Sequence, residues 1–294
     1  MSVWSFCPDA IRNNLSKIVI KNKGDADDLA EYRRLWGQWI EDFSGCENKK
    51  MWAITNGIHE AVINQIAHVS KHIKMFYKFN TDYLFYNTIL RPYNHQSISP
   101  SNLTTILPGS YVIVSQPNHE GGITPWFEPL KDHCRKNNIK IFLDCAFYGT
   151  TFDKLDTSDT IFDAVAFSLS KNFLLAGFRA GIVFGDNLSP TLTVPISRDF
   201  TYNYFNSQAV ECAKVILPNF KPTYITQFAK PQQLKYCMEN NLKPADIWMW
   251  AFNQHNQKIC ITDAIKNEVQ LLLNNADVKN YQSVLVYSDH TQNF

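Results

Sequence analysis

Apolar residues recur at helical spacing in several parts of the chain. Near the start they fall at Tyr32, Trp36 and Ile40, which predicts an amphipathic helix that begins close to Leu29. The same spacing, or a similar balance of apolar and charged positions, predicts further helices over residues 58–69, 126–136 and 263–274.

Short apolar runs between these helices predict strands. The runs cover residues 52–54, 73–79, 111–115, 139–143, 162–167, 182–184 and 283–287. Strands and helices alternate from about residue 50 to residue 186, which is typical of a layered α/β sheet.

The character of the chain changes after Gly185, where six prolines interrupt an aromatic-rich region. We therefore predict a large domain over residues 50–190, followed by an irregular segment and a reduced C-terminal small domain over residues 191–294. The N-terminal segment, residues 1–49, is expected to pack with that small domain.

Composition and charge exclude several classes of function. The chain has 294 residues, 45% of them hydrophobic, which is enough for a sizeable core. A net charge of +1 without a basic stripe argues against a nucleic-acid partner. We expect no membrane span and no signal peptide. Seven cysteines without CxxC spacing favour free thiols in the cytoplasm over a disulfide framework or a metal site.

The segment from Ser168 to Gly181 carries the most specific chemistry. It places Lys171 next to Ser170 and eight residues before Arg179, directly after a predicted core strand. Lysine rarely enters a core without a partner. An imine between lysine and an aldehyde cofactor needs such a placement, and pyridoxal phosphate (PLP) also brings a phosphate that suits hydroxyl and guanidinium donors.

Polar residues follow two other predicted strands. Asn118 and Asp144 stand, like Lys171, at carboxyl ends of strands, the edge where open α/β sheets bind ligands. Asn56 and Gly57 open a predicted helix, whose backbone N–H groups can bind an anion. In this order the residues resemble the fold-type I PLP-dependent enzymes, specifically the class I and II aminotransferases. The pattern Ser-x-Ser-Lys-(x)7-Arg-x-Gly matches that family at every fixed position.

The resemblance covers about residues 50–185 and implies both fold and cofactor. It implies a three-layer α/β/α large domain of the PLP-dependent transferase type, with a reduced α+β small domain, and a homodimer. Lys171 would form the internal aldimine, a Schiff base, and move protons. Asp144 would pair with the protonated pyridine nitrogen; its alternative is a strand-end cap.

The family pattern also implies a phosphate site. Ser168, Ser170 and Arg179 would bind the phosphate, although an arginine at the start of a strand can equally form a surface ion pair. The backbone N–H groups of Gly57 and Ile58, at the helix start opened by Asn56, would bind it too, or would serve only as a helix cap.

The resemblance also implies partners for the ring of the cofactor. Tyr83 would stack on it, or belong to the core. Asn118 would bond the ring oxygen, unless a shift of one residue places His119 there. The family tyrosine after the aspartate is Phe147 here, so Tyr148 is the remaining phenol nearby.

The sequence thus predicts a PLP-dependent aminotransferase acting on an amino acid or a small amine. The alternatives are a PLP-dependent decarboxylase or lyase on the same scaffold, and a degenerate non-catalytic homologue. The family clamps the substrate carboxylate with an arginine near the C-terminus. After Arg179 this chain has only Arg198, so the clamp is rebuilt or the substrate lacks a free carboxylate.

Overall fold

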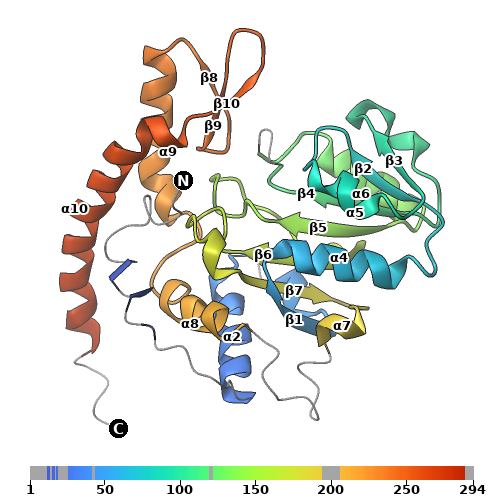
Figure 1. The fold of residues 1–294 in the computed structure, drawn as a ribbon, viewed down its shortest axis with the longest axis horizontal. Coiled ribbons are helices and arrows are strands. Elements are labelled where there is room, and N and C mark those ends of the chain that lie inside the picture. Colours follow the sequence, from blue (N-terminus) through green and yellow to red (C-terminus); the bar gives the residue numbers. More distant parts are fainter. Residues whose placement is uncertain are drawn as a thin grey trace.

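A mixed seven-stranded sheet forms the centre of the molecule (Figure 1). The computed structural model describes residues 12–13, 15–16, 18, 26–41, 44–118, 122–193 and 206–288, with no side chains beyond residue 276. The strands are β1 (Met51–Asn56), β2 (Phe76–Phe79), β3 (His95–Ile98), β4 (Tyr111–Ser115), β5 (Lys140–Cys145), β6 (Phe162–Ser168) and β7 (Ala180–Gly185). Their order in the sheet is β1-β7-β6-β5-β4-β2-β3.

The direction of the strands brings their polar ends together. Strands β3, β2, β4, β5 and β6 are parallel, and β7 runs antiparallel to both β6 and β1. Ser115 therefore lies opposite Asp144 at the carboxyl edge of β4 and β5. On the next pair of strands Ser168 lies opposite Gly181, at the start of β7. The polar residues that the sequence predicts for a ligand site therefore lie at this edge of the sheet.

Helices cover both faces of the sheet. One face carries α4 (Ile58–Val69), α5 (Phe85–Leu90) and α7 (Pro190–Thr193); the other carries α2 (Ala26–Trp39), α6 (Phe127–Lys136) and α8 (Ser207–Ile216). Alternate residues of a strand enter different layers: Ile113 of β4 packs in the cluster of α4, whereas Val112 packs in the cluster of α2. The prediction of a three-layer α/β/α arrangement is confirmed.

Short elements complete this part of the chain. They are α3 (Ser44–Glu47) and the 3₁₀ helices η2 (Pro100–Thr105) and η3 (Ala176–Phe178). The N-terminal helix α2 lies on the sheet, where the Tyr32 hydroxyl donates to the Gly181 carbonyl at 2.8 Å. Helix α2 also packs against α8. The division of the chain at residues 49 and 190 stays a prediction.

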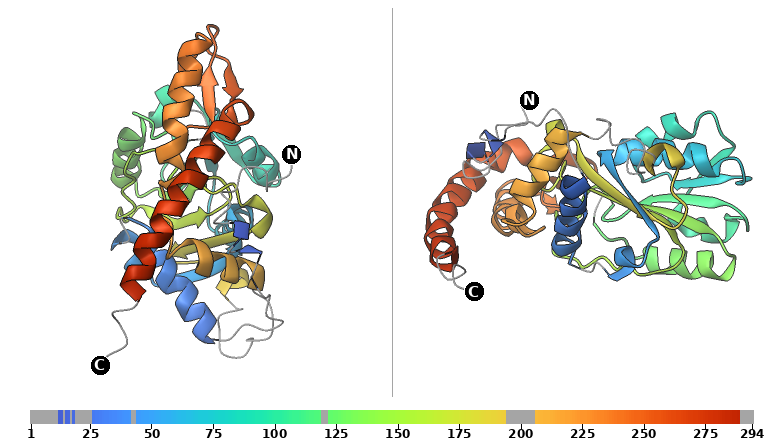
Figure 2. Two further views of the ribbon diagram at one scale, coloured as in Figure 1. Left: turned by 90° about the vertical axis from the view of Figure 1, so that its left-hand side faces the viewer. Right: turned by 90° about the horizontal axis from the view of Figure 1, so that it is seen from below.

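The C-terminal region stands at one end of the sheet (Figures 1 and 2). It contains two helices packed on each other and a small antiparallel sheet. These elements are α9 (Tyr224–Glu239), β8 (Lys243–Pro244), β9 (Trp250–Phe252), β10 (Lys258–Cys260) and α10 (Thr262–Ser288). No helix in the described part of the chain is long and apolar enough to cross a membrane.

The strand expected at residues 283–287 is wrong, because α10 continues through these residues to Ser288. The run of branched and aromatic residues there suggested a strand. No glycine or proline lies between residues 262 and 288 to end the helix.

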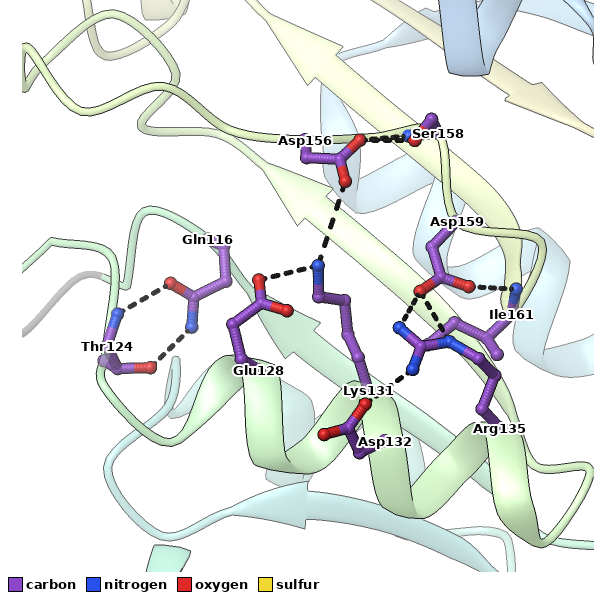
Figure 3. Close-up of polar contacts among 10 residues, drawn as sticks. All are labelled: Gln116, Thr124, Glu128, Lys131, Asp132, Arg135, Asp156, Ser158, Asp159 and Ile161. Carbon is purple, nitrogen blue, oxygen red and sulfur yellow. Dashed lines mark hydrogen bonds and ion pairs between the residues drawn. The ribbon is translucent and has the colours of Figure 1, made fainter.

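An ionic cluster joins α6 to the loop before β6 (Figure 3). Arg135 binds Asp159 at 2.6 Å, while Lys131 lies 2.7 Å from Glu128 and 4.0 Å from Asp156. We call these five residues, together with Asp132, which binds Arg135 at 2.6 Å, the α6 ionic cluster.

Candidate active site

A pocket of about 200 Å³ opens at the carboxyl edge of the sheet. Its walls come from the start of α4, the segment after β2, the ends of β4, β5 and β6, the η3 region and β9. The lining residues are Ile58, His59, Tyr83, Ser115, Asp144, Ala146, Phe147, Ser168, Ser170, Lys171, Ala176, Arg179 and Trp250.

Lys171 reaches the pocket from the loop that follows β6. Its ammonium group lies 5.6 Å from the centre of the Phe147 ring, a cation–π distance. Ser168, at the end of β6, is buried, and its hydroxyl oxygen accepts the N–H of Ser170 at 3.4 Å. The Ser-x-Ser-Lys segment therefore brings two hydroxyls and an amine to one wall.

Asp144 is the buried carboxylate of the pocket, at the end of β5. One of its oxygens accepts the hydroxyl of Tyr86 at 2.5 Å, and the other accepts the N–H of Ala146 at 2.8 Å. Burial raises the pKa of Asp144 to about 6, although both hydrogen bonds and the positive charge of Lys171 oppose this shift. Asp144 is therefore a carboxylate that a bound cation would stabilise.

Arg179 is held in the left-handed backbone region, with φ of 56°, directly before β7. Its guanidinium donates to the carbonyl of Asn56 at 2.6 Å and to that of Ala176 at 3.2 Å. Gly57 also has a positive φ, 73°, and a Cβ added there would lie 2.7 Å from the guanidinium. The close approach of these two segments thus requires a glycine.

This end of the pocket has donors for an anion. Helix α4 begins after Gly57 without a side-chain cap, which leaves N–H groups of its first turn available. A guanidinium has five N–H donors, and Arg179 commits only part of them to the two carbonyls. Ser168 and Ser170 add hydroxyls. A phosphate group matches this set of donors.

The donor set fits PLP. The anion end would hold its phosphate, Asp144 would face the protonated ring nitrogen, and the Lys171 amine would face the aldehyde. A metal ion finds no comparable site: the described residues contain no group of three His, Cys, Asp or Glu side chains that could bind one.

The structure brings most of the predicted site residues together. Those that line the pocket are Ile58, Tyr83, Asp144, Ser168, Ser170, Lys171 and Arg179. Asn56 and Gly57 stand behind them and contact the Arg179 guanidinium.

Two predicted residues lie elsewhere. Asn118 is buried outside the pocket lining, and its backbone exchanges hydrogen bonds with Gly122 at 2.6 and 3.1 Å. The Tyr148 ring packs on Trp39, and its hydroxyl accepts the N–H of Glu41 at 2.9 Å, away from the pocket. Tyr148 follows Phe147, which does line the pocket, so the turn after β5 sends the two rings to different places. His119 and Arg198 lie outside the described residues.

Several residues of the site were missed by the sequence analysis. Tyr86, which bonds Asp144, follows the predicted Tyr83 by three residues, and Ser115 is the last residue of a predicted strand. Trp250 gave no indication, because it comes from the remote strand β9; its ring meets Phe147 edge-on, with centres 5.1 Å apart.

His59 was also missed. Its ring stacks on Tyr83 with centres 5.6 Å apart. Burial, and then the positive charges of Arg179 and Lys171, lower its pKa, so the ring is neutral at pH 7. The Tyr83 face of the pocket is therefore aromatic and uncharged.

Comparison with known proteins agrees with this geometry. Residues 103–227 match the family model for aminotransferase class I and II. Solved structures with the same fold include tyrosine aminotransferase from Leishmania infantum (TM-score 0.62, 14% identity, 83% of this chain and 77% of that chain covered). A second is aspartate aminotransferase of Plasmodium falciparum (TM-score 0.59, 14% identity, 91% and 86% covered).

A third solved structure is the PLP-bound C-S lyase from Staphylococcus hominis (TM-score 0.63, 12% identity, 83% and 69% covered). A search of the curated proteins finds no match. The expected fold and the resemblance to fold-type I PLP-dependent aminotransferases are confirmed.

Proposed function

We propose that this chain is a PLP-dependent transferase of the aminotransferase type, which acts on an amino acid or a small amine. The observation that carries the proposal is the shared pocket of Lys171, Asp144 and Arg179. An amine, a buried carboxylate and a guanidinium at the carboxyl edge of an α/β sheet fit the aldehyde, the ring nitrogen and the phosphate of one cofactor.

Each of these residues has a distinct task. When bound, PLP supplies an electron sink for the negative charge that develops on the substrate carbon beside the amine. Lys171 would remove the proton from that carbon as a general base and would deliver it, as a general acid, to the former aldehyde carbon of the cofactor. Asp144 holds a proton on the ring nitrogen, while Arg179, Ser168 and Ser170 bind the phosphate.

The supporting contacts favour a fixed carboxylate. Tyr86 and the Ala146 N–H occupy one oxygen each of Asp144, so the carboxylate cannot rotate freely. Phe147 and Trp250 form an aromatic wall of the pocket on the side of Lys171. Charge interactions beside such a wall are stronger than in bulk water.

A covalent-trapping experiment tests the proposal. The purified protein is incubated with PLP, reduced with borohydride and analysed by peptide mass spectrometry. We expect a visible absorption band before reduction and PLP fixed to the peptide of Lys171 afterwards. Lys171→Ala should lose both, whereas Lys140→Ala, a control at an exposed lysine, should keep both. A protein that neither absorbs nor traps PLP would refute the proposal.

A lyase is the second candidate, because the C-S lyase from Staphylococcus hominis shares the fold and covers a similar part of the chain. Products distinguish the two. A transferase moves the amino group to an added 2-oxo acid, so a new amino acid appears. A lyase or decarboxylase instead releases a thiol or carbon dioxide without an acceptor.

We also propose that the chain forms a homodimer in the cytoplasm. The dimer is supported by the family resemblance, since such enzymes build their sites at a dimer interface. The compartment is supported by the six described cysteines, which are thiols rather than disulfides and of which five are buried. Sedimentation of the PLP-loaded protein tests the dimer; a monomer at micromolar concentration would contradict it.

A further inference from the structure

A second carboxylate is buried behind the pocket. Asp82 is 1% exposed and lies in the turn between β2 and α5. Its oxygens accept the N–H of Ser115 at 3.0 Å, the hydroxyl of Ser115, and the N–H of Tyr83 at 2.8 Å. Three donors that converge on one buried carboxylate favour its ionised form.

These hydrogen bonds tie Asp82 to the site. Ser115 lines the pocket and lies opposite Asp144 in the sheet. Asp82 connects Ser115 to the segment that begins with Tyr83. In this segment Tyr83 lines the pocket, and the Tyr86 hydroxyl donates a hydrogen bond to Asp144. Asp82 thus holds in place the residues that contact the ring-facing carboxylate.

Three titratable groups interact with Asp82, one each from β2, β5 and α5. Lys78 on β2 attracts it, while Asp144 on β5 and Tyr86 on α5 also interact with it electrostatically. Lys78 is 2% exposed, and its ammonium donates to the Phe79 carbonyl at 3.3 Å. Lys78 and Asp82 therefore interact through their charges without forming an ion pair.

The balance of these effects leaves Asp82 close to titration at neutral pH. Burial raises its pKa to about 7, the three hydrogen bonds oppose that rise, and the negative charge of Asp144 adds to it. A cation bound to Asp144 would cancel this last contribution and favour loss of the Asp82 proton.

We propose that Asp82 is a positioning residue of the cofactor site. Its hydrogen bonds to Ser115 and Tyr83 hold the segment that carries Tyr86 against Asp144, and its negative charge favours a cation bound there. The inference rests on the proposed function, because that cation is the protonated ring nitrogen of PLP.

The test compares the affinity for PLP of the wild-type protein and Asp82→Asn between pH 5.5 and 8.5, by absorbance titration. Asparagine has nearly the same shape but no charge. We expect the two dissociation constants to be similar at pH 5.5, where Asp82 is protonated, and to differ about tenfold at pH 8.5, with the variant weaker. Asp156→Asn, at a carboxylate of the α6 ionic cluster, is the matched control and should bind like wild type at every pH.

A second variant keeps the test decisive if Asp82→Asn does not fold. Ser115→Ala removes a hydrogen-bond donor that favours ionised Asp82. The affinity for PLP should still change with pH in this variant, but the midpoint of that change should lie at a higher pH than in the wild type. The proposal would be overturned if the ratio of the dissociation constants of Asp82→Asn and wild type were constant across the pH range. It would also be overturned if the midpoint of the pH-dependent change in affinity were the same in Ser115→Ala as in the wild type. Absence of trapping on Lys171 in the wild type would refute the proposed function itself, whereas normal trapping with a constant ratio would refute only the role of Asp82.

Discussion

The α6 ionic cluster and the pocket use the same type of residue in opposite ways. In the cluster, carboxylates meet Lys131 and Arg135, and the Asp156 side chain is 54% exposed. A hydrogen bond from Ser158 lowers the pKa of Asp156. At the pocket, Asp144 in its wall and Asp82 behind that wall are buried, their hydrogen bonds come from neutral groups, and burial raises the pKa of each.

The difference shows what distinguishes a structural charge from a functional one. A carboxylate whose cation is part of the protein is already stabilised and has no need of a ligand. Asp144 carries a charge that burial penalises and that nearby protein groups compensate only in part. Its preferred partner is a cation that arrives from outside, which is the condition for a binding site.

The largest effect should follow from removal of the pocket charge. Asp144→Asn keeps the shape of the side chain but cannot stabilise a protonated ring nitrogen. We expect turnover to fall about a hundred- to a thousandfold, as for other losses of a buried electrostatic contact. Steady-state kinetics at saturating PLP measures it, with Asp156→Asn as the control. Near-normal turnover in Asp144→Asn would show that Asp144 is not a functional carboxylate.

The pH dependence of stability should differ in sign between the two regions. Asp82 and Asp144 have folded pKa values of about 7 and 6, above the ordinary value of 3.8. The folded state therefore binds more protons than the unfolded chain between pH 4 and 7, and their contribution to stability falls as the pH rises through this range. Asp156, with its lowered pKa, contributes stability above pH 4 that is lost as the pH falls further.

Urea denaturation of the cofactor-free protein at pH 4.5, 6 and 8 measures this effect, which should amount to a few kcal/mol. Asp82→Asn should flatten the decline, and Asp156→Asn should leave it unchanged. If the unfolding free energy of Asp82→Asn declines with pH as steeply as that of the wild type, the decline is caused by groups other than Asp82.

The anion end of the pocket can be tested with two glycines. Gly57→Ala forces alanine into a positive φ and sets its Cβ 2.7 Å from the Arg179 guanidinium. Gly109→Ala meets a similar φ of 75° with nothing within 4 Å. Both should lose about 1–2 kcal/mol of stability from backbone strain. Only Gly57→Ala should also weaken PLP binding, by about tenfold, in an absorbance titration; equal binding by both variants would contradict the assigned anion site.

The smallest effect should come from the α6 ionic cluster. The Lys131 side chain is 4% exposed, but its partner Glu128 is 71% exposed and can be solvated by water when the lysine is removed. Lys131→Met keeps the apolar stem, so we expect a change in unfolding free energy below about 1 kcal/mol. Turnover should not change. A large loss of activity would show that the cluster is coupled to the pocket.

The core of the fold could be predicted because its strands are buried on both faces. Strands β4 and β6 stand out as apolar runs, and the motif around Lys171 follows the second of them. Strand β3 was missed because three of its four residues are exposed, in a sequence, His-Gln-Ser-Ile, without apolar alternation. Strand β3 pairs with β2 through backbone hydrogen bonds, and such pairing requires no recognisable pattern of side chains in the sequence.

The site was predictable only where one segment carries several of its groups. Lys171 and Arg179 belong to one motif, and Asp144 ends a recognisable strand. Trp250 reaches the pocket through the packing of distant segments, which no local spacing encodes. Asp82 precedes Tyr83 directly, yet its importance depends on burial against Ser115, and burial of one carboxylate in a turn cannot be read from its neighbours.

The wall formed by Trp250 has a consequence for how the protein is made. Synthesis delivers the pocket residues in order from Ile58 onward, and Trp250 is the last of those that line it. A growing chain therefore possesses its amine, carboxylate and guanidinium while one side of the pocket is still missing. Contacts between such distant segments form late in folding. The site proposed for PLP is therefore complete only on chains synthesised through β9, and tight retention of PLP would be a measure of finished assembly.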